Sequence, residues 1–260
     1  MKPRLASIVC LLVYPSLMSL TSAAADHRDR FEARIYKDAE GKTLPCRLLS
    51  PKEIKPGEKY PLVLFFHGAG ECGTDNEKQL VHAMNDFASD EIMARYPAFV
   101  VAPQCPEGQQ WVDTPWTADS HTMKEMPTEP LQQSLELVES LTKTLPVDTK
   151  RLYITGLSMG GFGVWDAIQR HPDRFAAALI VCGGGDPAFA EKIKHVPIWA
   201  FHGDSDPTVK PKRSREMIDA LKKAGGNPTY TEYEKTGHDS WTRTYADPQI
   251  YEWLFAQRKK

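Results

Sequence analysis

The chain has 260 residues, of which 41% are hydrophobic and 25% charged, as is usual for one soluble globular domain. A chain of this length can form a large core without metal ions or disulfides. Its formal net charge is −2, and the one basic cluster, at residues 258–260, is short. The composition therefore argues against a nucleic-acid-binding protein and against a polybasic membrane anchor.

The first 25 residues predict a secretory signal peptide. Residues 1–4 are basic, residues 5–20 are apolar, and small residues including Ala23 and Ala25 follow. The apolar run is short for a membrane span, although an uncleaved anchor or an N-terminal strand remain alternatives. We expect cleavage near Ala25, a secreted or periplasmic location without stable membrane insertion, and one domain at 26–260.

In that domain, strands and helices are expected to alternate. Two edge strands come first, and five continuous apolar runs then predict strands that are buried on both faces of a parallel sheet. In chain order, with a final strand added, the strands are expected at 31–38, 43–51, 60–68, 97–103, 151–156, 175–185, 196–203 and 227–235. Helices are expected at 76–96, 129–145, 159–172, 210–226 and 248–259. This order predicts an α/β domain with a mostly parallel central sheet flanked by helices.

A serine stands between the strand expected at 151–156 and the helix that follows it. Ser158 lies in the pattern Gly-x-Ser-x-Gly, between Gly156 and Gly160. In a sharp strand-to-helix turn, glycines at these positions remove Cβ atoms that would collide, and the serine hydroxyl projects above the sheet. The alternative is a glycine-rich turn with a serine that caps the helix. The context favours a nucleophile.

A nucleophilic serine needs a base, and the base needs an acid that orients it. Asp204 and Asp206 follow the strand expected at 196–203, and His238 follows the last strand. Functional groups collect at the carboxyl ends of parallel strands, so these side chains are expected near Ser158.

Four motifs then carry a resemblance that covers roughly residues 40–258. They are His-Gly-Ala-Gly-Glu at 67–71, Gly-Leu-Ser-Met-Gly-Gly at 156–161, His-Gly-Asp-Ser-Asp-Pro-Thr-Val at 202–209 and Gly-His-Asp-Ser-Trp at 237–241. The chain resembles the α/β-hydrolase superfamily, and within it small secreted esterases of the dienelactone hydrolase, feruloyl esterase and phospholipase/carboxylesterase kind. Related proteins are often labelled prolyl-oligopeptidase-like.

The resemblance implies roles for individual residues. The second acid of the third motif is the triad member in that family, which selects Asp206 over Asp204. The backbone amides of Ala69 and Met159 would form the oxyanion hole, with Gly70 as a possible variant. The family uses the residue at His67 structurally.

The resemblance also bears on the cysteines. Four cysteines remain after signal cleavage, at positions 46, 72, 105 and 182, and both disulfides and free buried thiols are compatible with the sequence. In the family's sheet order the strands that end at His67 and Pro103 are neighbours, so Cys72 and Cys105 are the favoured pair if a bridge forms.

Two further segments concern the substrate. The long segment after Pro103 carries Trp111 and Trp116, which could form an aromatic wall of the substrate cleft or belong to the core. Only a short stretch separates Val181 from Val196, so no lid domain is expected and the site should be open.

The sequence therefore predicts a secreted serine hydrolase that cleaves carboxylic esters, with no cofactor and no metal. Its expected partner is a small-molecule or polysaccharide-linked ester, with no nucleic acid, and its oligomeric state is not readable. The alternatives are a serine peptidase of prolyl-oligopeptidase type and a non-catalytic binding protein that retains the fold.

Overall fold

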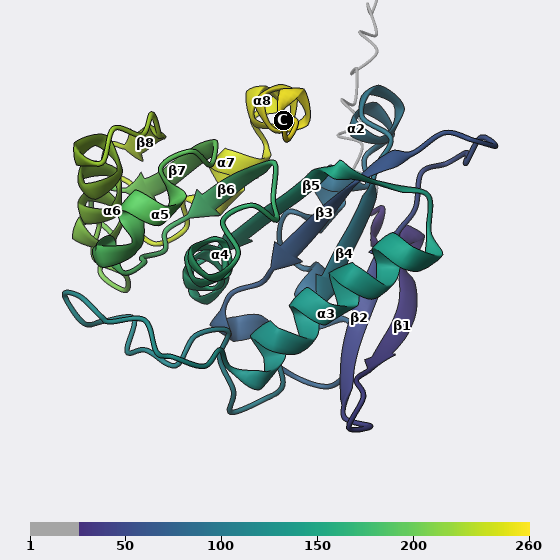
Figure 1. Ribbon diagram of the computed structural model, residues 1–260, viewed down its shortest axis with the longest axis horizontal. Coiled ribbons are helices and arrows are strands. Elements are labelled where there is room, and N and C mark those ends of the chain that lie inside the picture. Colours follow the sequence, from purple (N-terminus) through teal and green to yellow (C-terminus); the bar gives the residue numbers. More distant parts are fainter. Residues whose placement is uncertain (1–25) are drawn as a thin grey trace, which may run out of the picture.

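A computed structural model describes residues 26–260, and the predicted signal peptide lies outside this range. Eight strands form one sheet in the order β1-β2-β4-β3-β5-β6-β7-β8 (Figure 1). Their bounds are β1 Glu32–Lys37, β2 Thr43–Leu49, β3 Tyr60–Phe66, β4 Phe99–Pro103, β5 Val147–Leu157, β6 Ala177–Val181, β7 Ile198–Gly203 and β8 Thr229–Tyr233. The pairs β1–β2 and β2–β4 are antiparallel, and all other pairs are parallel. The expected α/β fold with a mostly parallel sheet is thus confirmed.

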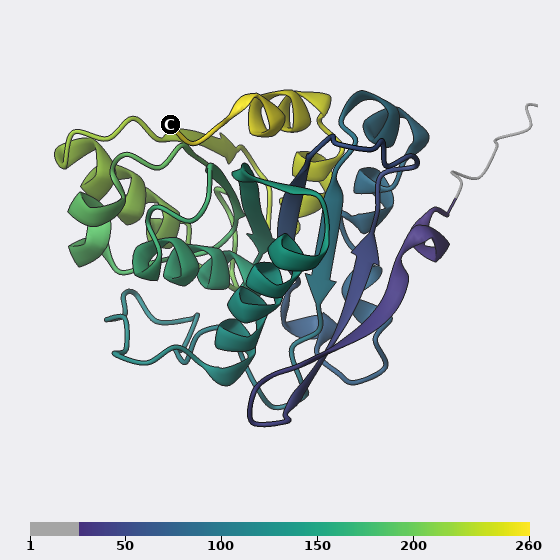
Figure 2. The same ribbon diagram turned by 45° about the vertical axis from the view of Figure 1, so that its right-hand side comes forward.

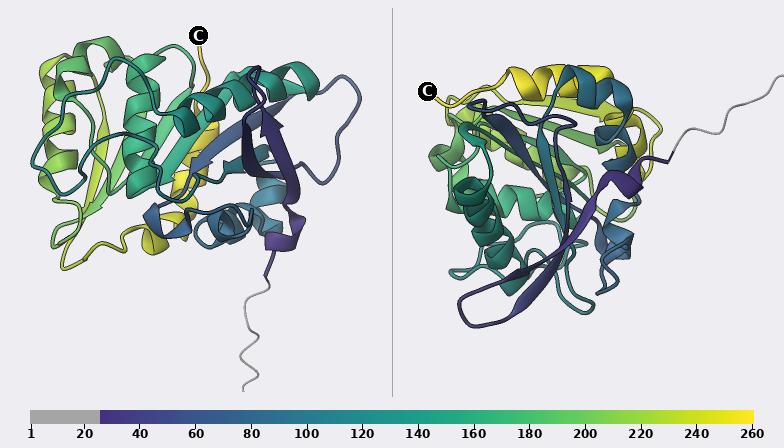
Figure 3. Two further views of the ribbon diagram at one scale, coloured as in Figure 1. Left: turned by 90° about the horizontal axis from the view of Figure 1, so that it is seen from below. Right: turned by 90° about the vertical axis from the view of Figure 1, so that its right-hand side faces the viewer.

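Helices cover both faces of the sheet, as the two outermost layers in Figures 2 and 3 show. One face packs against α3 (Glu129–Thr144), α4 (Met159–Arg170), α5 (Ala190–Ile193) and α6 (Lys212–Lys223). The other packs against α1 (Met84–Phe87), α2 (Asp90–Arg95), α7 (Trp241–Tyr245) and α8 (Pro248–Ala256). Within β3, Leu62 and Leu64 enter the first core and Val63 and Phe65 the second, which explains its unbroken apolar sequence.

The segment expected as one helix at 76–96 is instead broken into three short pieces. They are the 3₁₀ helix η3 (Lys78–Leu80), α1 and α2. Ala83 has φ 61°, outside the right-handed helical region, and Ser89 caps α2 by accepting a hydrogen bond from the Ile92 amide at 3.3 Å. The single-helix prediction was wrong because this backbone turn and this cap interrupt an otherwise helical pattern.

Between β6 and β7 the structure has only the 3₁₀ helix η4 (Pro187–Phe189) and α5, as expected for a fold without a lid domain. A long segment, residues 104–128, lies beside α4 and extends toward α6 (Figure 1). Across residues 26–260, no helix is both long enough and apolar enough to span a membrane.

Candidate active site

Ser158 occupies a sharp turn between β5 and α4. Its backbone has φ 53° and ψ −119°, a conformation that costs energy for any residue with a side chain. A Cβ on Gly160 would lie 2.0 Å from the carbonyl oxygen of Phe66, and one on Gly156 would lie 2.7 Å from the carbonyl oxygen of Gly160. Glycine is therefore required on both sides of the serine, because β3 passes directly beside the turn.

The structure brings Ser158 and His238 together. Ser158 Oγ lies 2.9 Å from His238 Nε2, within hydrogen-bonding distance. The serine comes from the β5–α4 turn and the histidine from the segment between β8 and α7, 80 residues later in the chain. The His238 side chain retains 22% exposure, so one face of the pair is open to solvent.

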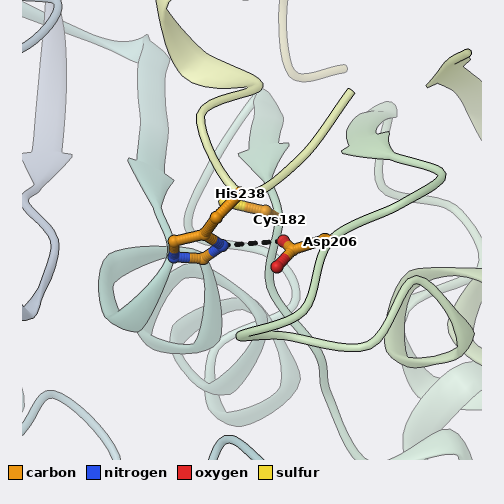
Figure 4. A group of neighbouring side chains, drawn as sticks. All are labelled: Cys182, Asp206 and His238. Atoms are coloured by element: carbon orange, nitrogen blue, oxygen red, sulfur yellow. Dashed lines mark hydrogen bonds and ion pairs between the residues drawn. The ribbon is translucent and has the colours of Figure 1, made fainter. Parts of the chain in front are cut away.

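His238 is held from its other nitrogen by Asp206. The distance from Nδ1 to Asp206 Oδ2 is 2.7 Å, and Figure 4 shows the two side chains facing each other. A hydrogen bond to Nδ1 fixes the ring so that Nε2 faces the serine as an acceptor. Of the two acids that follow β7, Asp206 is thus the one that contacts the histidine.

The surroundings of Asp206 keep it ionised. Burial alone would raise the pKa of its carboxyl, but hydrogen bonds from His202, from His238 and from the amide of Val209 outweigh burial and hold the pKa well below its usual range. Oδ1 accepts from the amides of Thr208 at 2.8 Å and Val209 at 3.0 Å.

Asp204 has a different environment. Its Oδ1 accepts a hydrogen bond from the Ser205 hydroxyl at 2.7 Å and lies 3.3 Å from the Thr236 amide. These contacts join the turn after β7 to the segment after β8, so Asp204 shapes the loops that carry the acid and the histidine.

The segment expected to bind an oxyanion follows β3. It forms the 3₁₀ helix η2 (Ala69–Glu71), and a Cβ on the preceding Gly68 would lie 3.7 Å from the Cβ of Ser158. Met159 is the first residue of α4, so its N–H has no carbonyl partner within that helix. The structure therefore places both of the segments that carry the expected amides beside the serine.

His67 is hydrogen-bonded to this segment and makes no hydrogen bond to Ser158. The residue is 1% exposed. Its Nδ1 lies 2.6 Å from the Gly68 carbonyl oxygen, and its Nε2 accepts a hydrogen bond from the amide of Cys105 at 2.9 Å. Burial lowers the pKa of His67 to about 4, so the ring is neutral at neutral pH. It joins the carboxyl ends of β3 and β4.

The two tryptophans expected at the substrate cleft behave differently. Trp111 is 0% exposed, stacks on Phe66 with ring centroids 4.5 Å apart, and donates to the His67 carbonyl oxygen at 3.0 Å. The expectation that Trp111 contacts substrate is wrong, because no surface of the indole is available to a ligand. Trp116 is partly buried against the same core, which leaves part of its side chain at the surface.

Three further residues pack around Asp206 and His238. His202 lies under Asp206, with Nε2 3.2 Å from Oδ2. Trp241 contacts the His238 ring almost perpendicularly, with ring centroids 5.2 Å apart. Cys182 lies behind the acid and the histidine (Figure 4). His202 could have been found from its motif, whereas Trp241 and Cys182 depend on how the loops pack.

Cys182, Asp206 and His238 offer a sulfur, an oxygen and a nitrogen that all lie within 4.8 Å of one another. Two properties argue against a metal site. His238 Nδ1 and the Asp206 carboxylate already bind each other, and burial raises the pKa of the Cys182 thiol well above its usual range, whereas a metal ligand must be a thiolate. We therefore interpret Cys182 as packing beneath the acid and the histidine.

Comparisons with known proteins agree with this architecture. A family model for esterases matches residues 39–253. The crystal structure of a thermostable esterase is 41% identical, with a TM-score of 0.82, over 89% of this chain and 64% of that one. A bifunctional acetylxylan esterase/xylanase of Neocallimastix patriciarum is 24% identical over 66% of this chain and 22% of its own length.

A third similar protein is an acylaminoacyl peptidase of Pyrococcus horikoshii. It is 19% identical, with a TM-score of 0.65, over 89% of this chain and 42% of the peptidase. At this level of identity the likeness concerns the fold alone. This chain spans less than two thirds of the length of each of these three proteins.

Proposed function

Since this chain belongs to the esterase family of the α/β-hydrolase superfamily, we propose that it is a secreted serine hydrolase that cleaves carboxylic esters. The single observation that carries the proposal is the continuous set of contacts from Ser158 through His238 to Asp206. A serine alone is a weak nucleophile, and this arrangement is one that activates it.

The proposed reaction has two stages. His238 accepts the proton of Ser158 as the hydroxyl oxygen attacks the ester carbonyl, and Asp206 stabilises the charged imidazole. The amides of Ala69 and Met159 hold the negative oxygen of the tetrahedral intermediate. His238 then returns the proton to the leaving alcohol. Water repeats the sequence on the acyl-enzyme and releases the acid.

The substrate is an ester on a small molecule or on a polysaccharide. The acetylxylan esterase named above and the predicted export of the chain support an ester carried by an extracellular carbohydrate. The connection between β6 and β7 is short, which leaves the Ser158 side of the sheet accessible to a bulky polymer.

A peptidase is the second candidate, because the fold is shared with acylaminoacyl peptidase. The two candidates differ in the bond they prefer. The esterase proposal requires that p-nitrophenyl acetate and butyrate are hydrolysed with higher kcat/KM than aminoacyl or prolyl p-nitroanilides. The reverse order would favour the peptidase.

The Ser158→Ala variant tests the role of the serine. We expect kcat for p-nitrophenyl acetate to fall by about 10⁵-fold or more while the melting temperature is retained, because the hydroxyl is needed only for chemistry. Ser205→Ala, an exposed serine beside the acid, is the matched control and should keep wild-type activity. Retained turnover in Ser158→Ala, or failure of a fluorophosphonate to label Ser158 in the wild type, would contradict the proposal.

A further inference from the structure

Cys72 and Cys105 lie beside each other at the carboxyl ends of two neighbouring strands. β3 and β4 pair in parallel, with Leu64 opposite Val101. Cys72 directly follows η2, and Cys105 is the second residue after β4. The amide of Gly73 donates to the Cys105 carbonyl oxygen at 3.0 Å, which holds the chain after Cys72 against Cys105.

The two thiols are close enough to affect each other's pKa, and they differ in exposure. Both lie at the same edge of the sheet, where the backbone hydrogen bond from Gly73 to Cys105 holds their segments together. Cys72 is partly exposed, whereas Cys105 is 0% exposed. Cys72 is therefore the member of the pair that an external disulfide can reach, as an attacking cysteine must be, and Cys105 is placed beside it as the resolving cysteine.

The other two cysteines of the described chain differ from this pair. Cys46 is 1% exposed and Cys182 is 0% exposed. Burial raises the pKa of Cys46 to about 11 and that of Cys182 well above its usual range. Neither is exposed to an external disulfide, so the first attack should come from Cys72 and oxidation should be confined to its pair.

We propose that Cys72 and Cys105 are a disulfide site that, on oxidation, ties the oxyanion segment after β3 to the end of β4. With a small-molecule disulfide such as oxidised glutathione, the Cys72 thiolate attacks one sulfur and one glutathione thiolate leaves. Cys105 then loses its proton to water and attacks the Cys72 sulfur, and the second glutathione thiolate leaves. Two protein thiols are oxidised, and one external disulfide is reduced to two thiols.

The position of the cross-link gives it a structural consequence. The segment from Gly68 to Gly73 is already fixed at its start, because the preceding residue, His67, accepts a hydrogen bond from the Cys105 amide. A covalent bond at Cys72 fixes its other end to the same residue and closes the chain from 72 to 105 into a loop. Such a bond restricts the unfolded chain, so the oxidised protein should be more stable.

The test compares the reduced full chain with the chain equilibrated in oxidised glutathione. We expect the thiol count in denaturant to fall by two, and peptide mass spectrometry to find Cys72 linked to Cys105. The melting temperature should rise by about 5–10 °C and return with dithiothreitol. Cys72→Ser should abolish all three changes, whereas the matched control Cys46→Ser should keep them.

Several results would overturn the inference. These are an unchanged thiol count in the wild type, a stable glutathione adduct on Cys72, a bridge that includes Cys46 or Cys182, and a thermal shift that persists in Cys72→Ser. The outcome is separable from that of the proposed function, because Ser158→Ala should form the same bridge. Cys72 is partly exposed, so its serine variant remains a test even where Cys105→Ser does not fold.

Discussion

At the scale of single residues, steric contact restricts the turn around Ser158 closely. The backbone of β3 passes so close to α4 that Gly160 has no room for a methyl group, and Ser158 is forced into a positive-φ conformation. The sequence predicted this turn correctly because few local structures other than a sharp strand-to-helix turn need a glycine on each side of a serine. The catalytic roles of Ser158, Asp206 and His238 remain predictions that mutation can test.

Gly160→Ala should destabilise the protein strongly. The added Cβ would lie 2.0 Å from the Phe66 carbonyl oxygen, so backbone must move, at a cost of about 3 kcal/mol or more. Gly70→Ala is the matched control, because nothing lies within 4 Å of the position of its Cβ. Urea unfolding measures both. Equal free energies of unfolding for the two variants would mean that the close approach of β3 and α4 is not real.

Asp206→Asn should lower kcat by about 10⁴-fold with little change in KM. The amide can turn its NH₂ group toward His238 and favour the wrong tautomer. It also lacks the negative charge that stabilises the protonated imidazole. Asp204→Asn should stay within about threefold of the wild type, since Asp204 contacts Ser205 and Thr236 and not the histidine. Steady-state kinetics with p-nitrophenyl acetate distinguish the two. A larger loss in Asp204→Asn would reassign the acid.

At the scale of elements, the strands were more predictable than the helices. The buried strands are continuous apolar runs, and all eight expected strands occur. β5 begins earlier than expected, at Val147, because Val147 pairs with Tyr60 of β3. The register between the two strands then shifts before the pairing resumes at Leu62.

The break at Ala83 and the short helix α7 had no signature in the sequence, because tertiary packing sets them. Trp111 was misassigned because composition cannot distinguish a buried loop tryptophan from one in a cleft.

Buried polar contacts help to hold the long segment 104–128 to the body of the protein. Arg213 of α6 is 0% exposed and donates to the carbonyl oxygens of Ala118 at 3.3 Å and Gly185 at 3.1 Å. It also lies 2.6 Å from His121 Nδ1, and its guanidinium carbon lies 5.5 Å from the ring centroid of Phe162. One side chain thus connects this segment to both α4 and the residues after β6.

Arg213→Met should make residues 104–128 more mobile and more accessible to a protease. Losing charge-assisted hydrogen bonds of about 1.5 kcal/mol or more should speed tryptic cleavage after the exposed Lys124 by about tenfold or more. Arg215→Met is the control, because Arg215 is on the same helix but exposed, where it pairs with Glu232. Limited proteolysis followed by mass spectrometry gives the rates. Identical rates for Arg213→Met and Arg215→Met would contradict an anchoring role.

At the scale of the whole molecule, stability should depend on pH through His67. Its pKa is about 4 in the folded protein, whereas an unfolded histidine titrates near 6.5. As pH falls from about 6.5 to about 4, the unfolded chain takes up a proton that the folded chain does not, so the free energy of unfolding decreases. The contribution, about 3 kcal/mol, is fully present above pH 6.5 and is lost on acidification.

Urea unfolding of the wild type and of His67→Gln at a series of pH values between 4 and 7 checks this prediction. The wild type should lose stability steadily across the range, and the variant should show a shallower dependence even where it is less stable at pH 7. Parallel curves for the two proteins would show that other groups control the acid sensitivity.

The contact between Trp241 and His238 has a practical consequence. The centroids of the two rings are 5.2 Å apart, so the indole experiences a change of local electric field when His238 takes up and returns a proton in the proposed reaction. The difference in fluorescence between the wild type and Trp241→Phe should therefore report the charge of the histidine during the proposed reaction, which makes Trp241 an internal optical probe of the His238 ring.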